Sequence, residues 1–139
     1  MSPRRATEVL IVLTILVISM GGMIRIYDAG ESCPDWPTCF GTWGFDISEE
    51  EQGEWWEENP DEADSRGSGH RYSSFQIFTE WFHRLLAGAF VGPLVILNWL
   101  LIRKEAWTSS RVRGVSSLTL GLILWQGAIG WLTVKMDNE

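Results

Sequence analysis

Positive charge is scarce in this chain of 139 residues, which has 11 Lys and Arg residues against 18 Asp and Glu residues. The net charge of −7 argues against a nucleic-acid partner, because proteins that bind nucleic acids present basic surfaces. The acidic residues are also unevenly spread, since most of them lie within residues 45–71. The mean hydropathy of +0.00 therefore conceals a separation into polar and apolar segments.

Three segments carry almost no charge and are long enough to cross a bilayer, which requires about 20 apolar residues. They lie within residues 8–27, 73–103 and 114–135. A soluble core helix of such length would show a polar stripe, whereas LIVLTILVISMGGMI and FVGPLVILNWLLI show none. The nine tryptophans include several at boundaries between apolar and polar segments, as in an interfacial belt. The sequence predicts an all-α integral membrane protein whose residues 1–139 form a single membrane domain.

The first apolar segment has an alternative interpretation as a cleaved signal peptide, because Arg4 and Arg5 precede it and glycines end it. A signal peptide ends in a cleavage site of small residues, and no convincing Ala-x-Ala site follows here. The string Ile24, Arg25 and Ile26 also fits a cleavage region poorly. We therefore expect a retained helix.

The basic residues predict how the chain is oriented in the cell membrane. They flank the first span and fill the connection at 104–113: Arg4, Arg5, Arg103, Lys104, Arg111 and Arg113. Positively charged connections remain in the cytoplasm. We expect a multi-pass protein with a cytoplasmic N-terminus, a large acidic extracytoplasmic loop at 28–72 and an extracytoplasmic tail after residue 134.

Cysteine is rare, and both cysteines lie in the string CPDWPTCFG of the outer loop. The prolines between Cys33 and Cys39 favour a turn, and disulfides persist outside the cytoplasm. A structural disulfide in so small a ring would contribute about 2 kcal/mol. A redox-active pair is the alternative and requires an exposed bond with a lowered thiol pKa. A metal site is less favoured, because no histidine lies nearby in the sequence.

The rest of the loop, SEEEQGEWWEENPDEADSRGSG, is acidic and rich in residues that form turns. This composition predicts a solvated and partly mobile insertion. A docking surface for a basic partner and a salt-adapted surface are two further interpretations that the sequence leaves open.

The second span begins with a capping box, in which Ser73 is followed three positions later by Gln76. Glu80, His83 and Arg84 then follow at i, i+3 and i+4, so that they project from one face of the helix. A helix over residues 73–103 is roughly 45 Å long at 1.5 Å per residue, against a hydrocarbon core of about 30 Å. We expect its first turns, with this polar face, in the outer headgroup region.

Ionisable side chains at membrane depth indicate function by default. One interpretation pairs Glu80 with Arg84 and leaves His83 at the interface. The other makes His83 an axial ligand of haem iron, with Glu80 as an acid–base or electrostatic group beside it.

A haem site also needs small residues, and the spans contain glycines that meet this need: Gly21, Gly22, Gly88, Gly127 and Gly130. Packing between helices explains each of these glycines equally well. Arg25 follows the first pair and is placed either to meet a haem propionate or to extend to the outer headgroups.

Three strings together resemble the N-terminal half of the haem A synthase family of cytochrome oxidase assembly enzymes: GGMIRIYDAGESCPDWPTCFG, TEWFHRLLAG and QGAIGWLTV. The resemblance implies three transmembrane helices of a four-helix-bundle half-repeat. It also implies oxidation of the C8 methyl group of haem O to the formyl group of haem A, with a haem of the O or B type as cofactor. Family members with paired loop cysteines form a disulfide, which here would join Cys33 and Cys39.

The resemblance implies roles for individual residues as well. It makes Glu80 catalytic and His83 a haem ligand. With these we expect Arg84, Arg25, Gly21 and Gly22 to take part in binding the haem.

This chain departs from the family pattern after GWLTV, where a fourth helix with a second histidine is expected and the sequence ends in KMDNE. The other histidine, His70, lies in the outer loop. We therefore expect a shortened piece of a longer protein, a homo-oligomer, or a second subunit that supplies the fourth helix and second histidine. A terminal oxidase or its assembly factors are further expected partners. The alternative function is a non-catalytic haem-binding or haem-delivery subunit of a terminal oxidase complex.

Overall fold

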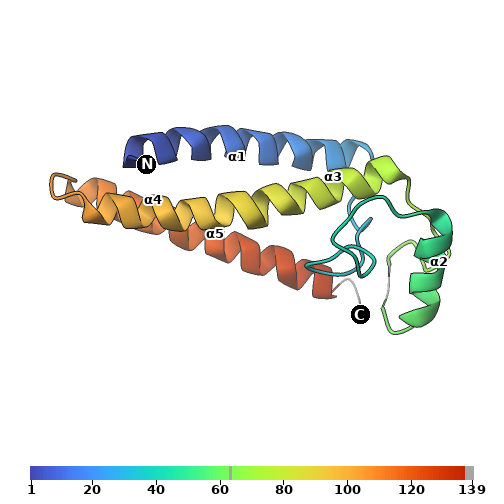
Figure 1. Cartoon of the computed structure of the whole chain (residues 1–139). Coiled ribbons are helices and arrows are strands. Elements are labelled where there is room, and N and C mark those ends of the chain that lie inside the picture. The colour runs from blue at the N-terminus through green and yellow to red at the C-terminus, as the bar shows by residue number, and fades with distance from the viewer. Residues whose placement is uncertain (63, 137–139) are drawn as a thin grey trace. The chain divides into compact units, whose positions relative to one another are not determined.

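The computed structural model describes residues 1–62 and 64–136 of the chain, apart from the side chains of residues 134 and 135. Part of the predicted C-terminal tail, residues 137–139, lies outside the described residues. The described chain consists of helices and connections, with no strand (Figure 1). The helical elements in chain order are α1 (Pro3–Ile26), α2 (Glu49–Glu58), α3 (Ser74–Leu85), η1 (Leu86–Val91), α4 (Gly92–Lys104) and α5 (Ser110–Met136).

Three helical segments are long and apolar enough to cross a membrane: Pro3–Ile26, Ser74–Lys104 and Ser110–Thr133. The second of them joins α3, η1 and α4 end to end. These findings confirm the prediction of an all-α membrane protein with three spans.

The π-helical turn η1 interrupts the second span just before Pro93. Proline has no backbone N–H, and its ring collides with the carbonyl four residues earlier in an α-helix. Here the N–H of Gly92 donates to the carbonyl of Ala87, five residues back. The wider turn relieves the crowding, and α4 continues to Lys104 with Pro93 in its first turn.

The chain divides into two compact units, of which the first comprises Met1–Ile18 and Arg84–Ile129. In α1 and α4 the Thr7 hydroxyl donates to Asn98 Oδ1 at 3.4 Å. The buried residues of η1 and α4 are Leu86, Val91, Val95, Asn98 and Ile102, and the last four follow helical spacing. They form a narrow seam, while none of the apolar window of α5 is buried within the described chain.

The second unit comprises Ser19–His83 with the end of α5, and it has a compact core. The buried members of this core come from the cysteine loop, the acidic segment and the start of α3: Cys33, Cys39, Phe40, Ile47, Trp56, Tyr72 and Ile77. Trp55 and Trp81 pack against it. Phe45 adds a contact with α3, its ring centroid lying 5.0 Å from those of Phe78 and Trp81.

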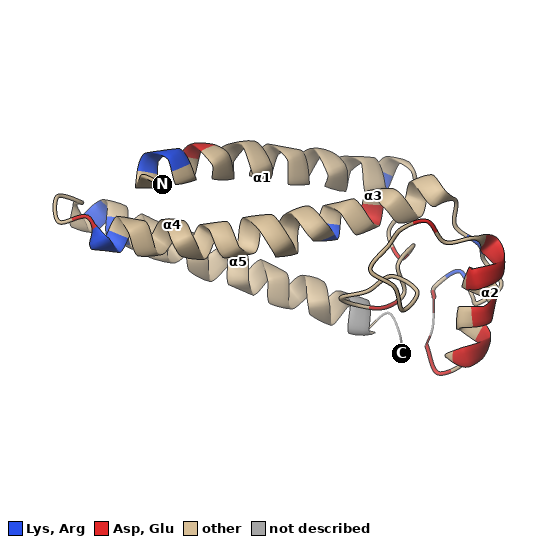
Figure 2. Cartoon of the chain, viewed as in Figure 1, with Lys and Arg blue, Asp and Glu red and all other residues tan. Residues whose placement is uncertain are grey.

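The acidic segment is folded around helix α2 (Figure 1). A capping box of Ser48 and Glu51 begins this helix. The amide of Gln52 donates to the Tyr72 carbonyl at 2.9 Å and accepts from the Tyr72 N–H at 2.8 Å. The prediction of a solvated insertion is right for the exposed carboxylates of α2 (Figure 2) and wrong for Gln52 and Trp56. Both are buried because their face of α2 meets the core.

Arg66 connects the acidic segment to the residues that follow α1. Its guanidinium forms an ion pair with Asp28 Oδ1 at 2.8 Å and donates to the Asp28 carbonyl at 2.9 Å. The guanidinium carbon also lies 5.3 Å from the centroid of the Tyr72 ring. Asp28 has a φ of 54°, which turns the chain out of the helix and towards the cysteine loop.

Candidate functional site

The candidate site begins at the first turn of α3, where the predicted capping box is present. The Ser73 N–H donates to Gln76 Oε1 at 3.0 Å, and the Gln76 N–H donates to Ser73 Oγ at 3.3 Å. The Gln76 Nε2 group also donates to the carbonyls of Tyr27 and Asp28, at 3.1 and 3.3 Å. These bonds place the start of α3 against the end of α1.

Glu80 lies one helical turn after Gln76 and is 8% exposed. Its Oε2 atom accepts a hydrogen bond from the Ser32 hydroxyl at 2.9 Å and another from the Cys33 N–H at 3.0 Å. A buried carboxylate is costly unless it is hydrogen-bonded, and bonds to a charged acceptor are the stronger kind. The first residues of the cysteine loop therefore hold the Glu80 side chain in place.

Ser32 has no exposed surface, and its hydroxyl oxygen also lies 3.0 Å from the Gln76 carbonyl oxygen. The same carbonyl accepts from the Thr79 hydroxyl at 2.8 Å. The sequence analysis missed Ser32, because it reaches Glu80 across 48 positions and no local spacing marks such a pair. Its only local signal is its place directly before Cys33.

Cys33 and Cys39 form a disulfide, and each is 1% exposed. A pair of backbone hydrogen bonds between Cys39 and Thr42, at 2.9 and 3.1 Å, closes the turn that follows the ring. Within this turn Gly41 has a φ of +71°, a conformation that glycine adopts without strain. Thiol exchange requires access to the bond, so this burial favours the structural interpretation of the cysteine pair over the redox interpretation.

The structure brings His83 together with Gly21. A Cβ atom built at Gly21 would lie 3.6 Å from His83 Nε2 and 3.9 Å from its Cδ2, so the imidazole faces the bare backbone of α1. Gly22 is exposed with no atom within 4 Å of its Cβ position, and Arg25 is also exposed. Arg84, which belongs to the first unit, is half-buried.

Three further glycines are candidates for a haem site or for helix packing. Gly88, Gly127 and Gly130 have no atom within 4 Å of their Cβ positions, so no close packing occurs at them within the described chain. The His70 ring packs edge-on against Tyr72, with 4.6 Å between the centroids.

The donor set fits a haem group in its chemistry. Imidazole is a common axial ligand of haem iron, and His83 Nε2 lies beside Gly21, where α1 carries no side chain. Gly22 leaves a further position of α1 uncovered, with no atom within 4 Å of its Cβ position. No cluster of three His, Cys, Asp or Glu side chains suited to a bare metal ion occurs in the part of the chain that the structure describes.

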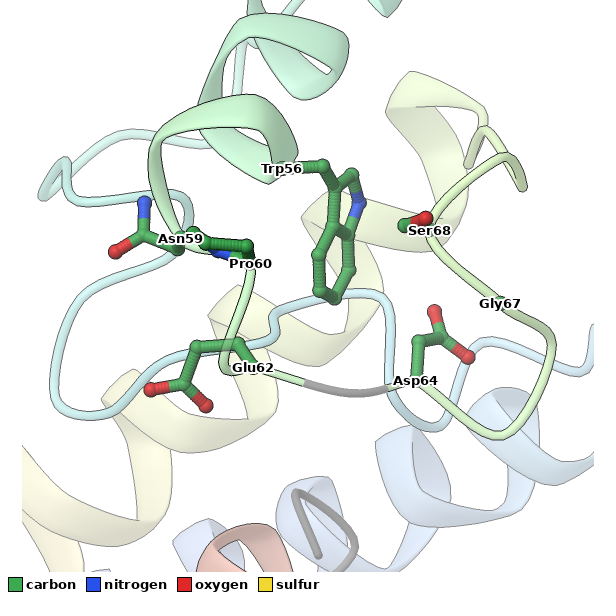
Figure 3. Close-up of a pocket in the computed structure, with 7 residues that line it drawn as sticks. All are labelled: Trp56, Asn59, Pro60, Glu62, Asp64, Gly67 and Ser68. Atoms are coloured by element: carbon green, nitrogen blue, oxygen red, sulfur yellow. The ribbon is translucent and has the colours of Figure 1, made fainter.

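A hollow of about 300 Å³ lies elsewhere, in the acidic segment (Figure 3). Its lining residues come from the end of α2 and the turn that follows: Trp56, Asn59, Pro60, Glu62, Asp64, Gly67 and Ser68. Asp64 accepts a hydrogen bond from the Tyr72 hydroxyl. Burial, assisted by this hydrogen bond, raises the pKa of Tyr72 well above its usual value. None of the residues expected to bind haem lines this hollow.

Comparison with known proteins identifies relatives over nearly the whole chain. A protein named haem A synthase from Shewanella oneidensis is 34% identical over 93% of this chain and 36% of its own length. Another haem A synthase, from Neorickettsia sennetsu, is 30% identical over 97% of this chain and 42% of its own length. A haem A synthase–mitochondrial ferredoxin fusion protein from Schizosaccharomyces pombe is 30% identical over 88% of this chain and 20% of its own length.

The chain thus spans less than half the length of these relatives. No solved structure matches the chain. The model of the COX15-CtaA family, described as cytochrome oxidase assembly protein, matches residues 4–138. This match covers all three spans and the cysteine loop, and the chain belongs to the COX15-CtaA family of cytochrome oxidase assembly proteins.

Proposed function

We propose that this chain takes part in haem A synthesis, in which the C8 methyl group of haem O is oxidised to the formyl group of haem A. The observation that carries the proposal is the buried Glu80 carboxylate, held by Ser32 and the Cys33 N–H one helical turn before His83. An ionisable side chain that is buried within a membrane-spanning helix usually has a function. The names of the relatives support the same reaction class.

Each residue of the site has a separate task in this proposal. His83 would supply an imidazole to the haem iron, and the absence of side chains at Gly21 and Gly22 would leave α1 open to the macrocycle. Glu80 takes up a proton at Oε2 or stabilises positive charge that develops at the methyl carbon. Arg84 and Arg25 would each offer a guanidinium group to a haem propionate. The bound haem supplies the oxidative chemistry, which no side chain provides.

We further propose that the active assembly contains more polypeptide than this chain. The spans contain one histidine, His83, and the relatives are more than twice as long as the matched region. A continuation of this chain, a second copy or a second subunit would supply a fourth helix and a second histidine. A terminal oxidase or its assembly factors are the partners expected to receive the product.

In the proposed topology, the N-terminus is cytoplasmic and the cysteine loop is extracytoplasmic. Within the first unit, the basic residues at the start of α1 and at the end of α4 lie toward the same end (Figure 2). The positive-inside rule assigns that end to the cytoplasm. The buried disulfide of the second unit suits an oxidising compartment.

The test is first to identify the polypeptides that copurify with the chain in mild detergent. The chain is then expressed together with them in a bacterial host that makes haem O but no haem A, and the haem is extracted from the membranes. Haem A should appear with the wild-type chain. It should be absent with Glu80→Gln and remain with Glu54→Gln, which alters an exposed carboxylate of α2. Haem A formation that is unchanged by Glu80→Gln contradicts the catalytic role.

A second candidate function is haem binding or haem delivery without catalysis. The single imidazole of the spans favours it, because one ligand is enough to hold haem for transfer. This candidate predicts that the purified wild-type protein has a haem Soret band that His83→Ala alters, while extracted membranes contain no haem A.

A further inference from the structure

The hydroxyl group of Ser32 lies between two acceptors and has only one proton to give. Its oxygen is 2.9 Å from Glu80 Oε2 and 3.0 Å from the Gln76 carbonyl oxygen. A serine hydroxyl donates one hydrogen bond and accepts up to two. It therefore cannot donate to both neighbours at the same time.

The two possible arrangements correspond to the two protonation states of Glu80. When Glu80 is ionised, the hydroxyl donates to Oε2, and the Gln76 carbonyl keeps its bond from Thr79. When Oε2 carries a proton, that proton can be donated to Ser32 Oγ, and the hydroxyl turns to the Gln76 carbonyl. In both arrangements Ser32 and Glu80 remain hydrogen-bonded.

The backbone around Ser32 fixes its hydroxyl in this position. The Ser32 N–H donates to the Ala29 carbonyl at 3.2 Å, and the Ala29 N–H donates to the Ile24 carbonyl of α1 at 2.9 Å. On the other side, Ser32 is followed directly by Cys33, whose N–H donates to Glu80 and whose sulfur is in the disulfide. The oxygen is thus held where a rotation of its O–H bond alone exchanges the acceptors.

We propose that Ser32 is a positioning residue for Glu80, whose carboxyl group it holds in one place whether or not that group carries a proton. The inference rests on the proposed function in that Glu80 is the group that exchanges a proton with the substrate. A proton that arrives at Oε2 forms one O–H bond there, the Ser32 hydroxyl rotates to Gln76, and no other proton is displaced. The reverse rotation restores the carboxylate when the proton leaves.

The test uses the full chain in lipid vesicles and records the infrared bands of its carboxyl groups. The Glu80 bands are assigned by their loss in Glu80→Gln. Ser32→Ala should shift these bands, because a hydrogen bond to the carboxyl group is removed, and Ser32→Thr should restore them. The matched control is Thr79→Val, which removes a buried hydroxyl from the same Gln76 carbonyl without a bond to Glu80.

Haem A formation gives a second readout. Ser32→Ala should lower the turnover rate at saturating haem O by about tenfold or more, as part of the roughly 10²–10⁴-fold contribution of a positioned acid or base. The half-saturating haem O concentration should stay the same, because Ser32 acts through Glu80. Ser32→Thr should recover most of the rate.

The infrared measurement decides the inference even if the chain makes no haem A, since it needs neither substrate nor turnover. Glu80 bands that are the same in Ser32→Ala and wild type overturn the role of Ser32. Absence of haem A with the wild-type chain counts only against the proposed function. A Ser32→Ala protein that exposes reactive thiols without reductant has lost its fold, and Ser32→Thr then decides, because its bands must match the wild type.

Discussion

The two units of this chain are stabilised in different ways. The second unit has a core with a disulfide, several aromatic rings and paired polar side chains such as Gln52. The first unit has a narrow seam along α4, and the apolar window of α5 has no buried residue in the described chain. The second unit therefore has interactions of the kind that stabilise a protein in water, whereas the first unit leaves most of its apolar surface for lipid or another polypeptide.

This difference bears on the proposed role of Glu80. A catalytic carboxylate must be held in a fixed position, and Glu80, for which we propose that role, lies in the unit whose core and hydrogen bonds fix side chains. The helices of the first unit provide length and an apolar surface.

The largest effect is expected for catalysis. Glu80→Gln should lower haem A formation by roughly 10²–10⁴-fold, because the amide cannot take up a proton as the carboxylate does. Asn98→Leu, which replaces a buried polar residue of the first unit, should change it by far less. Haem extraction from membranes with equal amounts of each variant measures both. Equal losses would contradict a specific role for Glu80.

The next effect compares two tryptophans. Trp56→Ala should lower the free energy of unfolding of the second unit by about 3–5 kcal/mol, because Trp56 is 5% exposed and fills the core. Trp125→Ala, at a site that is 67% exposed in α5, should change stability by less than about 0.5 kcal/mol. Each variant is unfolded with denaturant in detergent, and unfolding of the second unit is monitored by how readily a protease cleaves residues 45–72. A large effect at Trp125 would reveal a polypeptide that covers α5.

A smaller effect is expected from the cysteine ring. Replacing Cys33 and Cys39 together by alanine should cost about 2 kcal/mol, since the unfolded chain gains the freedom of a short open loop. The loss should appear as faster proteolysis of the second unit, while the helical circular dichroism of the spans stays unchanged. Thiol labelling of the wild-type protein without reductant should be negative. Two reactive thiols would contradict the buried disulfide.

The smallest effect concerns Tyr72, whose pKa is raised from its ordinary value of 10.0 by burial and by the hydrogen bond to Asp64. The unfolded chain then loses its phenol proton at a lower pH than the folded chain. The contribution of the protonated Tyr72 phenol to the free energy of unfolding is therefore complete below about pH 10 and declines as the pH rises further. Tyr72→Phe should cost about 1 kcal/mol at neutral pH and remove this alkaline decline. Unfolding curves at several pH values give the free energy of unfolding of each protein as a function of pH. The same decline above about pH 10 in Tyr72→Phe and in the wild type would contradict this prediction.

Local patterns in the sequence predict a large part of this structure. The three spans are visible as uncharged runs, and the Ser73–Gln76 capping box marks the start of α3. The shared face of Glu80 and His83 follows from helical spacing alone. The roles assigned to these two residues remain predictions.

Contacts between distant segments could not be predicted in the same way. Ser32 meets Glu80, Gly21 meets His83 and Arg66 meets Asp28 only because the cysteine loop and the acidic segment fold back onto α1 and α3. The acidic segment differs from its prediction for another reason. Its composition is typical of a solvated insertion, but it also contains a local helix signal, because Ser48 and Glu51 form the capping box at which α2 begins.

Gln76 has a consequence for how sequences of this kind can vary. Its side chain caps the start of α3 and donates to the carbonyls of Tyr27 and Asp28, which follow α1. Its own carbonyl accepts from the Thr79 hydroxyl and lies 3.0 Å from the hydroxyl oxygen of Ser32. Only an amide of this length has both a donor and an acceptor that reach in opposite directions. A glutamate at this position would face two carbonyl oxygens with like partial charge, so a change there is expected to be accepted only together with a rebuilt junction between α1 and α3.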